Sequence, residues 1–317
     1  MAHPEIIAIG EPLFELSRPP NSSLWHEGIG GDVSNAMVAA SRCGAATGIV
    51  TALGDDFSGR AIRALWRAEG IDAAHVRSHA SAPTGVYFIT HGATGHEFTY
   101  ARNGSAASLF CAADLPADYL GRARILHVSG ISQAISGSAS DAVVAAMHLV
   151  RRRGGLISYD TNLRLKLWPL PRAKTIIHQA MQHIDIALPG LDDARLLTGL
   201  ADPDAIAGFY LDLGAKIVAL TLGKDGCLIA TPQQRRRIAA IKTDAVDATG
   251  AGDTFDGAYL AEYLATGDPF RAGLFANAAA ALSTRGFGAV GPMPRRADVL
   301  AALAGAGQTT AVMPPST

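Results

Sequence analysis

The chain has 317 residues, of which 49% are apolar and 17% are charged, against about 25% charged in an average soluble domain. Its net charge of −1 excludes a global field that would recruit nucleic acid or an anionic membrane, and no apolar run approaches the roughly 20 residues of a spanning helix. Three scattered cysteines without metal or disulfide spacing, and an N-terminus without a signal-peptide pattern, lead us to expect a cytoplasmic protein.

Short apolar runs alternate with amphipathic stretches along the chain. Buried strands are predicted for residues 6–10, 47–53, 124–129, 156–160, 184–189 and 216–221. Helices that end at glycine are predicted for residues 33–44, 58–70 and 136–154. This alternation predicts an α/β fold with a mainly parallel sheet and helices on both of its faces. From residue 250 onward, helical patterns dominate.

One region breaks the alternation. The runs TGVYFITH (84–91) and HEFTYAR (96–102) are joined by Gly-Ala-Thr-Gly, which is a hairpin pattern. Together with the segment LFELSRPPNSSLW, this hairpin predicts a small β lid built from about residues 11–30 and 81–104. We expect the lid to belong to a single domain of residues 1–305, followed by a loose tail at 306–317 that has little to bury.

Three side chains of the predicted hairpin fall on one face of its second strand by the period of two. They are Phe98, Tyr100 and Arg102. An aromatic group and an arginine that point the same way are suited to hold an oxygenated anion. Packing of these aromatics against the main domain is the alternative that the pattern leaves open.

The stretch DATGAGDTF (247–255) precedes a helical pattern. Glycine allows close backbone approach, and the free N–H groups at a helix N-terminus attract anions. Gly250, Ala251 and Gly252 are therefore candidates for a phosphoryl cradle. A carboxylate beside a phosphate is repulsive, so Asp253 makes sense as a base that takes a proton from an attacking hydroxyl. An ordinary Gly-rich turn is the alternative reading of this stretch alone.

Four motifs in a fixed order carry a resemblance over about residues 5–303. They are GGDVSN (30–35), LGDDFSG (53–59), TLGKDG (221–226) and DATGAGDTF. In this combination the sequence resembles the ribokinase-like, or PfkB-type, carbohydrate kinases. The resemblance implies a three-layer α/β/α fold and transfer of a phosphoryl group from ATP to a sugar hydroxyl.

The resemblance also implies roles for single residues. Asp253 is expected to be the general base, and the backbone of Gly250 to Gly252 is expected to be the anion hole. The residues implied on the sugar side include Gly31 and Asn35. The residues implied near the nucleotide are Asn162, Thr221, Gly223, Gly226 and Asn277. A monovalent-cation site, suited to K⁺, is implied at Asp247 and Thr249.

The sequence departs from the family at the position that helps to organise Mg²⁺. Many members carry Asn-x-x-Glu after the strand that matches residues 184–189, and here the run is Gly190-Leu-Asp-Asp193. Asp193 is suited to orient magnesium-bound water, because Mg²⁺ usually keeps several waters. The alternative interpretation is that Asp193 only stabilises the N-terminus of a helix through the helix dipole.

The run DTNLRLKLW (160–168) narrows the expected substrate. It is similar to the D-x-N-x-R run of 2-keto-3-deoxygluconate kinases, although some fructokinases share it. The residues implied to contact the substrate are Tyr87, Tyr100, Arg102 and Arg164. Arginine binds a carboxylate bidentately, which agrees with an acid sugar. A salt bridge from Arg164 to Asp160 or to another surface carboxylate is the alternative for that arginine.

We therefore expect ATP-dependent phosphorylation of 2-keto-3-deoxygluconate at its 6-hydroxyl, with Mg²⁺. The alternatives are a fructokinase, or another hexose or ketose kinase, and a non-catalytic sugar sensor. The intact DATGAGDTF stretch argues against the sensor, because a sensor needs no base. A small lid sheet has exposed edges, and pairing of lids would cover them, so a homodimer or larger oligomer is expected.

Overall fold

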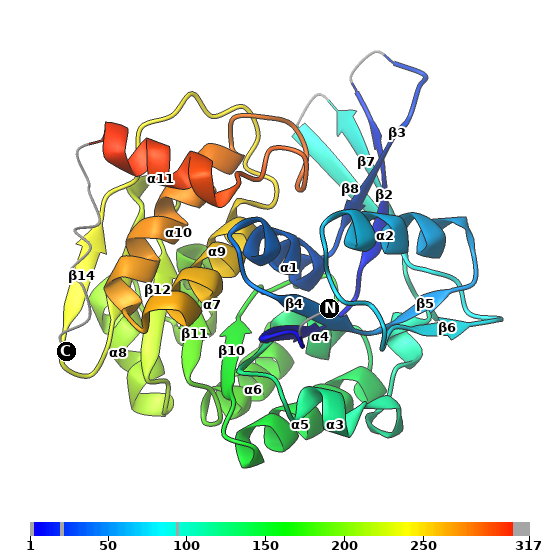
Figure 1. Cartoon of the computed structure of the whole chain (residues 1–317), viewed down its shortest axis with the longest axis horizontal. Helices are drawn as coiled ribbons and strands as arrows, with labels where there is room; N and C mark the ends of the chain where they lie inside the picture. The colour runs from blue at the N-terminus through cyan, green and yellow to red at the C-terminus, as the bar shows by residue number, and fades with distance from the viewer. Residues whose placement is uncertain (1–2, 20–21, 93–94, 307–317) are drawn as a thin grey trace.

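The structure is a computed structural model that describes residues 3–19, 22–92 and 95–306. Residues 307–317, which make up nearly all of the predicted tail, lie outside the described residues. Figure 1 shows a central sheet covered by helices, with a smaller sheet beside it. The central sheet has eight strands in the order β14-β13-β12-β11-β10-β9-β1-β4.

Six neighbouring strands of the central sheet, from β12 to β4, run parallel. The last two at the other edge, β13 and β14, are antiparallel. The bounds are β1 Ile6–Ile9, β4 Thr47–Val50, β9 Ile125–Ser129, β10 Leu156–Asp160, β11 Ile186–Leu188, β12 Ile217–Thr221, β13 Cys227–Ala230 and β14 Arg235–Ile238. The predicted mainly parallel sheet is confirmed.

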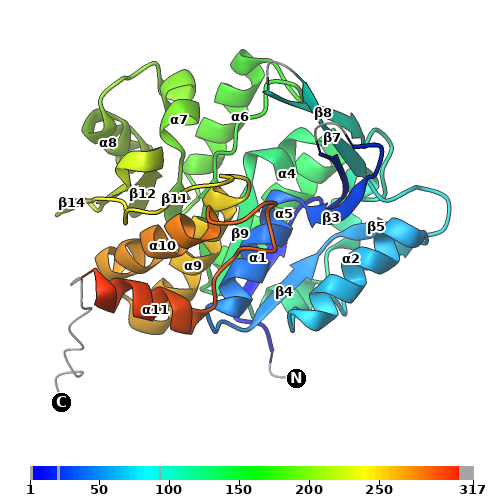
Figure 2. The same ribbon diagram turned by 90° about the horizontal axis from the view of Figure 1, so that it is seen from above.

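Helices cover both faces of this sheet, as Figure 2 shows. One layer contains α3 Ala117–Leu120, α4 Gly130–Ala134, α5 Gly137–Arg152, α6 Leu170–Met181, α7 Leu191–Thr198 and α8 Pro203–Leu213. The other layer contains α1 Asp32–Arg42, α2 Phe57–Ala68, α9 Ala251–Thr266, α10 Pro269–Ser283 and α11 Arg296–Gly305. The chain therefore has the expected three layers.

Alternation along each strand divides the apolar core in two. Ile7 and Ile9 of β1 pack with the α5 and α6 layer, whereas Ile6 and Ala8 pack with the α1 and α9 layer. Successive side chains of a strand point to opposite faces, so a strand buried on both faces is mostly apolar, and the buried His127 of β9 and Ser158 of β10 are hydrogen-bonded to each other. This requirement explains why the sequence predicts these strands as continuous apolar runs.

The small sheet is the predicted β lid. Its strand order is β3-β2-β7-β8, with β2 parallel to β7 and the other pairs antiparallel. The bounds are β2 Leu13–Arg18, β3 His26–Gly30, β7 Val86–Gly92 and β8 Gly95–Ala101. The lid stands beside the main sheet in Figure 1.

One predicted strand is two strands in the structure. Residues 47–53 form β4, which ends at Val50, and β5 Ala52–Gly54, which pairs with β6 Arg77–His79 in a separate two-stranded sheet. Thr51 lies between them, and its carbonyl accepts a hydrogen bond from the Arg77 N–H. An apolar run cannot reveal this change of partner, because both halves are buried.

Candidate active site

A cavity of about 1030 Å³ lies where the parallel strands end, between the main sheet and the lid. Ligands in open α/β sheets bind at this edge. The predicted site residues that line it are Gly31, Asn35, Tyr87, Tyr100, Arg102, Asn162, Arg164, Asp193, Thr221, Thr249, Gly250, Gly252 and Asp253. Residues that are far apart in the sequence are thus brought together around one space.

The start of α9 has the features of an anion-binding helix terminus. Gly250 precedes the helix with φ of 74°, and a Cβ there would lie 3.0 Å from Ala289 Cα, so the position requires glycine. Gly252 is helical, and a Cβ on it would meet no described atom within 4 Å. In the first turn of α9, the N–H groups of Gly252 and Asp253 have no acceptor among the described residues and can bind an anion, whereas the Ala251 N–H donates to the Ala248 carbonyl at 3.1 Å.

Asp253 lies in the same first turn, and Asn35 holds its carboxylate. Asn35 Nδ2 donates a hydrogen bond of 2.7 Å to Asp253 Oδ2. Burial, and then the nearby Asp32 carboxylate, raise the pKa of Asp253 to about 7, while the Asn35 hydrogen bond and Arg164 act in the opposite direction. A carboxylate with a pKa near neutrality is well matched to general-base work.

Close backbone packing sets the distance between Asn35 and Asp253. Gly31 precedes α1 with φ of 103°, and a Cβ on it would lie 2.4 Å from the Glu11 carbonyl oxygen. A Cβ on Gly257 of α9 would lie 2.0 Å from the Ala36 carbonyl oxygen of α1. Glycine at both positions therefore lets α1 approach α9 and the segment that follows β1 more closely than any other residue would.

Further carboxyl groups line the cavity beside Asp253. Asp256 lies one turn later on α9, is 4% exposed, and hydrogen-bonds to Asp160 at the end of β10. Burial raises the pKa of both carboxyls well above their usual range. The Asp32 charge raises both pKa values further, and Asp160 also raises the pKa of Asp256. Two carboxyls that are hydrogen-bonded to one another share a proton, so the pair carries less than two charges.

The loop after β10 brings Asn162 and Arg164 to the cavity. Asn162 has φ of 27°, and its N–H donates to Asp160 Oδ1 at 3.0 Å. Arg164 Nη1 lies 3.9 Å from Asp193 Oδ2, so among the described residues the alternative salt bridge is formed with Asp193 and not with Asp160. The Arg164 side chain is 51% exposed. The Leu163 N–H donates to Asp193 Oδ2 at 2.8 Å. Burial is the main cause of the raised pKa of Asp193.

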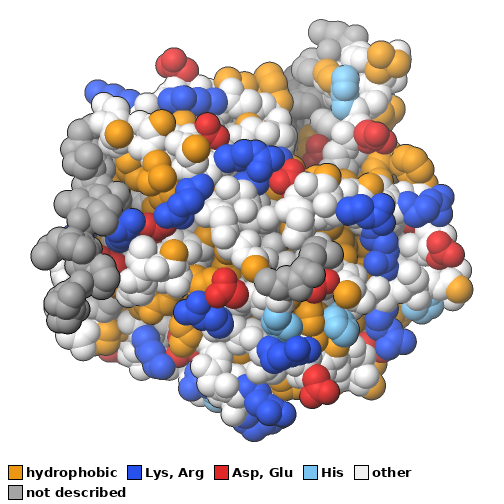
Figure 3. All heavy atoms as spheres, viewed as in Figure 1, with side chains coloured by type: hydrophobic (Ala, Val, Ile, Leu, Met, Phe, Trp, Pro, Cys, Tyr) orange, Lys and Arg blue, Asp and Glu red, His pale blue; other side chains and the backbone are white. Residues whose placement is uncertain are grey.

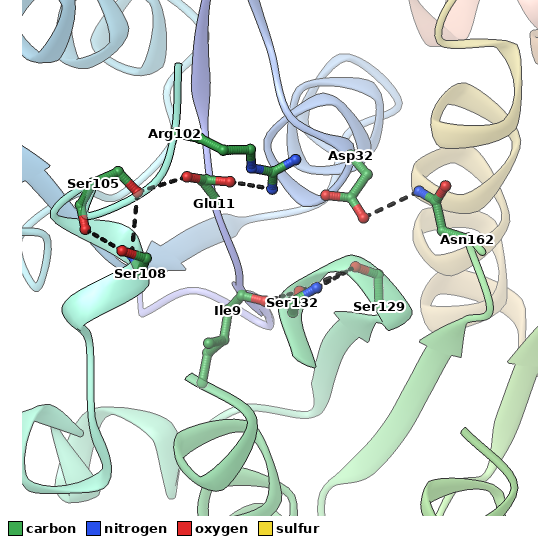
Figure 4. A network of polar contacts seen from close by, with 9 residues as sticks. All are labelled: Ile9, Glu11, Asp32, Arg102, Ser105, Ser108, Ser129, Ser132 and Asn162. Atoms are coloured by element: carbon green, nitrogen blue, oxygen red, sulfur yellow. Dashed lines mark hydrogen bonds and ion pairs between the residues drawn. The ribbon is translucent and has the colours of Figure 1, made fainter. Parts of the chain in front are cut away.

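The lid supplies the opposite wall. Tyr87 and Tyr100 stack with ring centroids 5.9 Å apart, and the Tyr87 hydroxyl donates to the buried Glu15. Arg102 is ion-paired with the buried Glu11 and lies over the Tyr100 ring at 5.5 Å. Figure 4 shows this pair, with Ser105 as a further partner of Glu11. The lid arginine is thus already partnered inside the protein.

The residues expected near the nucleotide divide into two groups. Asn162 and Thr221 line the cavity, whereas Gly223, Gly226 and Asn277 are absent from the described lining of the cavity. A Cβ on Gly226 would lie 2.0 Å from the Ile238 carbonyl oxygen, so it needs glycine for packing. Asn277 is buried on α10 and donates to the Ala239 carbonyl at 2.8 Å.

Asp247 joins two loops beside the anion-binding helix start. Its Oδ1 accepts from the Thr249 N–H at 2.9 Å and from Thr249 Oγ1 at 2.7 Å, and its Oδ2 accepts from the Gly288 N–H at 2.9 Å. Within residues 3–19, 22–92 and 95–306, no group of three or more His, Cys, Asp or Glu side chains is arranged to hold a metal ion. Any cation here would have to rely on few side chains, backbone carbonyls and water.

Sequence reasoning did not predict the roles of Glu11, Glu15, Asp32 and Asp256. Asp256 carried a usable signal, because i,i+3 spacing places it on the same face of α9 as Asp253. Glu11 and Asp32 each adjoin a predicted feature, the end of the first strand and Gly31. Their partners, however, are residues far along the chain, which no local pattern reveals.

An α/β/α fold with a lid, and a cavity that joins a carboxylate of raised pKa to a glycine-rich helix start, is the architecture of a carbohydrate kinase. The chain belongs to the pfkB family of carbohydrate kinases, whose family model matches residues 5–296. It is 33% identical to 2-dehydro-3-deoxygluconokinase of Thermoproteus tenax over 307 residues, which is 93% of each chain. It is 34% identical to fructokinase-1 of Zea mays over 284 residues, which is 86% of this chain and 87% of that one.

A solved structure supports the same fold. A protein from E. coli provisionally named ribokinase II, in complex with ATP and Mg²⁺, matches with a TM-score of 0.88 and 25% identity over 95% of this chain and 99% of that chain. The expected family and the ribokinase-like fold are therefore confirmed, and the chain is a sugar kinase.

Proposed function

We propose that this sugar kinase phosphorylates 2-keto-3-deoxygluconate, also called 2-dehydro-3-deoxygluconate, on its 6-hydroxyl. The observation that carries the proposal is that the half-exposed Arg164 side chain lines the same cavity as Asp253. Its Nη1 lies 3.9 Å from Asp193 Oδ2 and donates to the Leu163 carbonyl at 3.0 Å, while Nε and Nη2 have no hydrogen-bond partner among the described residues. An arginine of this kind can bind a substrate carboxylate with its planar fork. The T. tenax relative has the same named activity.

Arg102 has a different place in this proposal. Because Glu11 already offsets its charge, it offers the substrate a positioned guanidinium rather than an unpaired cation. Tyr87 and Tyr100 add flat faces and hydroxyl groups to the same wall. We propose that these three lid residues contact the sugar, with Arg164 as the main partner of its carboxylate.

The proposed reaction is an in-line transfer from ATP. Asp253 takes the proton of the 6-hydroxyl, the sugar oxygen forms a bond to the γ-phosphorus, and the bond from that phosphorus to the ADP oxygen breaks. The first-turn amides of α9 stabilise the negative charge on the transferred group. Asn35 holds the Asp253 carboxylate in place throughout. The nucleotide is proposed to extend from Asn162 and Thr221 toward Gly223, Gly226 and Asn277.

Mg²⁺ would supply charge neutralisation on the phosphates. The oxygen donors of the cavity fit this ion, because Asp193 is a hard ligand and Mg²⁺ tolerates a mostly water shell. A monovalent cation such as K⁺ would fit beside Asp247 and Thr249, whose loop adjoins Gly250. In both cases the proposed role of the protein is to orient the ion through one or two side chains.

A fructokinase is the second candidate, and the maize relative supports it at a similar identity. A coupled ADP-release assay over ribose, fructose, 2-keto-3-deoxygluconate and 2-keto-3-deoxygalactonate separates the two. The proposal expects the highest kcat/KM on an acid sugar. A clear preference for fructose would replace the proposed function with the second candidate.

Two properties of the whole protein complete the proposal. The lid leaves β3 and β8 at its edges, and pairing of lids in a homodimer would cover them.

A cytoplasmic location agrees with the three free cysteines, of which Cys43 and Cys227 are buried with their pKa values raised to about 12 by burial. Basic and acidic side chains are interspersed on the face shown in Figure 3. None of the described helices is long and apolar enough to cross a bilayer.

A further inference from the structure

Asp32 is a cavity-lining carboxylate to which neither the catalytic nor the carboxylate-binding role applies. It is the first residue of α1 and is 8% exposed. Its Oδ2 accepts a hydrogen bond of 3.1 Å from Asn162 Nδ2. Its Oδ1 is buried and has no hydrogen-bond partner among the described residues. A buried, unpaired carboxylate oxygen is costly, so an oxygen in this state calls for a donor from a ligand.

The partner that holds Asp32 is itself under backbone strain. Asn162 is the one non-glycine residue with positive φ among the residues that the structure describes. Its N–H is bound to Asp160 and its side-chain amide is bound to Asp32, as Figure 4 shows for the second contact. Strained residues of this kind persist where the surroundings fix them, and they cluster at ligand sites. The position of the Asp32 carboxylate is thus determined before any ligand arrives.

The charges around Asp32 define what its free oxygen can bind. Within the described part of the chain, Asp32 has no cation within 4.0 Å, and Arg102 is engaged with Glu11 instead. A carboxylate accepts hydrogen bonds and repels phosphate and other carboxylates. Asp32 lies three residues before Asn35 on α1, hence on the same face, and Asn35 holds Asp253, so the Asp32 and Asp253 carboxylates line the same part of the cavity. The complementary group is therefore a neutral donor that lies near the reacting oxygen.

We propose that Asp32 is a sugar-binding residue that accepts a hydrogen bond from a hydroxyl of the acceptor sugar other than the one that is phosphorylated. This inference rests on the proposed sugar-kinase reaction at Asp253. It also defines an orientation, because a carboxylate on the sugar has to point away from Asp32 and toward Arg164. Asp32 thereby selects for a hydroxyl near the reacting end of the substrate.

The test replaces Asp32 by asparagine and measures steady-state kinetics on the best acceptor of the four-sugar panel. In Asp32→Asn the amide oxygen still serves Asn162, and an N–H₂ group replaces the charged acceptor that faces the cavity. The expected result is a rise of about 10-fold or more in KM for the sugar, with KM for ATP unchanged, because a hydrogen bond to a charged group contributes more than a neutral one. Measurement near pH 8, about one unit above the Asp253 pKa, keeps the base ionised in both enzymes.

The matched control is Asp192→Asn, which removes the same charge from a side chain that is 96% exposed on α7. It should leave both KM values unchanged. If Asp32→Asn melts below the assay temperature, Asp32→Ser provides a smaller acceptor for the same comparison. An unchanged sugar KM in a folded Asp32 variant, or an equal rise in both KM values, would overturn the inference.

The two proposals fail in distinguishable ways. A wild-type preference for fructose removes the proposed substrate but leaves the Asp32 test intact, because fructose also carries hydroxyl donors. A wild-type enzyme that phosphorylates none of the four sugars removes the proposed function and the inference with it. A normal sugar KM in Asp32→Asn, beside an active wild type, removes the inference alone.

Discussion

The Asn35 amide lies 2.7 Å from the Asp253 carboxylate and joins α1 to α9 across 218 residues of sequence. The contact connects the helix that follows Gly31 to the helix that begins with the anion-binding turn. It favours the ionised form of a base whose pKa is raised to about 7 by burial and by Asp32. The first two predictions follow from this relationship.

Asp253→Asn keeps the shape of the side chain and removes the proton acceptor. We expect kcat to fall by at least ~10²-fold, the lower range for general-base catalysis. ATP should still bind, because the first-turn amides of α9 are backbone groups. Steady-state kinetics and ATP titration by calorimetry check this, and near-normal turnover would remove Asp253 from the mechanism.

Asn35→Ala should move the acid limb of the pH profile of kcat/KM to higher pH. The Asn35 hydrogen bond lowers the pKa of Asp253, so its loss raises that pKa further above its ordinary value. Because the base works only when ionised, a higher pKa requires a higher pH for the same rate. A profile recorded from about pH 5.5 to 9 measures the shift. An acid limb that does not move, or that moves to lower pH, contradicts the prediction.

Gly252→Val should abolish activity while the protein stays folded. Gly252 is helical rather than in the positive-φ region, and a Cβ there meets no described atom within 4 Å, so the side chain would enter the space where phosphate approaches. The matched control is Gly137→Val, at the exposed start of α5 with the same free space. Melting temperatures should fall similarly in both variants. An active Gly252→Val with an unchanged KM for ATP would place the anion hole elsewhere.

Arg164→Ala should raise KM for 2-keto-3-deoxygluconate by roughly 10–150-fold, the range for a hydrogen bond to a charged group. Fructose, which has no carboxylate, should be affected much less. Arg164→Lys should rescue only partly, because an ammonium cannot reproduce the bidentate fork. The ratio of the kcat/KM losses on the two sugars is the measurement. Equal losses would show that Arg164 serves phosphate or structure.

Asp256→Asn should raise stability at neutral pH. The pKa of Asp256 is raised in the folded protein, so the folded state keeps a proton that the unfolded state releases above its ordinary pKa. The Asp256 carboxyl therefore costs no stability below its ordinary pKa. Between that pKa and the raised pKa of the folded state, the free energy of unfolding falls by about 1.4 kcal/mol for each pH unit. An asparagine needs no such proton and can still donate to Asp160.

Melting temperatures of wild type and Asp256→Asn at about pH 4 and pH 8 check this prediction. The gain should be small at the lower pH and larger at the higher one. A gain of equal size at both values, or a loss at pH 8, would argue against a shared proton between Asp160 and Asp256.

The sequence by itself determined the features that depend on local chemistry. Doubly buried strands need apolar side chains on both faces, so the main parallel strands could be predicted, and only the partner change at Thr51 was missed. The glycine before α9 could be predicted to have a special backbone, because positive φ at Gly250 excludes most residues. Asp253 could be predicted to lie at the cavity because its position follows that turn directly.

Only the tertiary structure decided which charged side chains are free and which are partnered. Arg102 and Arg164 look equivalent in the sequence, yet Arg102 meets a buried glutamate, whereas the half-exposed Arg164 lies 3.9 Å from Asp193. Asp32 reaches Asn162 across 130 residues, and Asp160 at the end of β10 reaches Asp256 of α9. Such pairings depend on how the strands and helices pack, because a side chain a few ångströms long acquires its partner from whatever backbone the fold brings beside it.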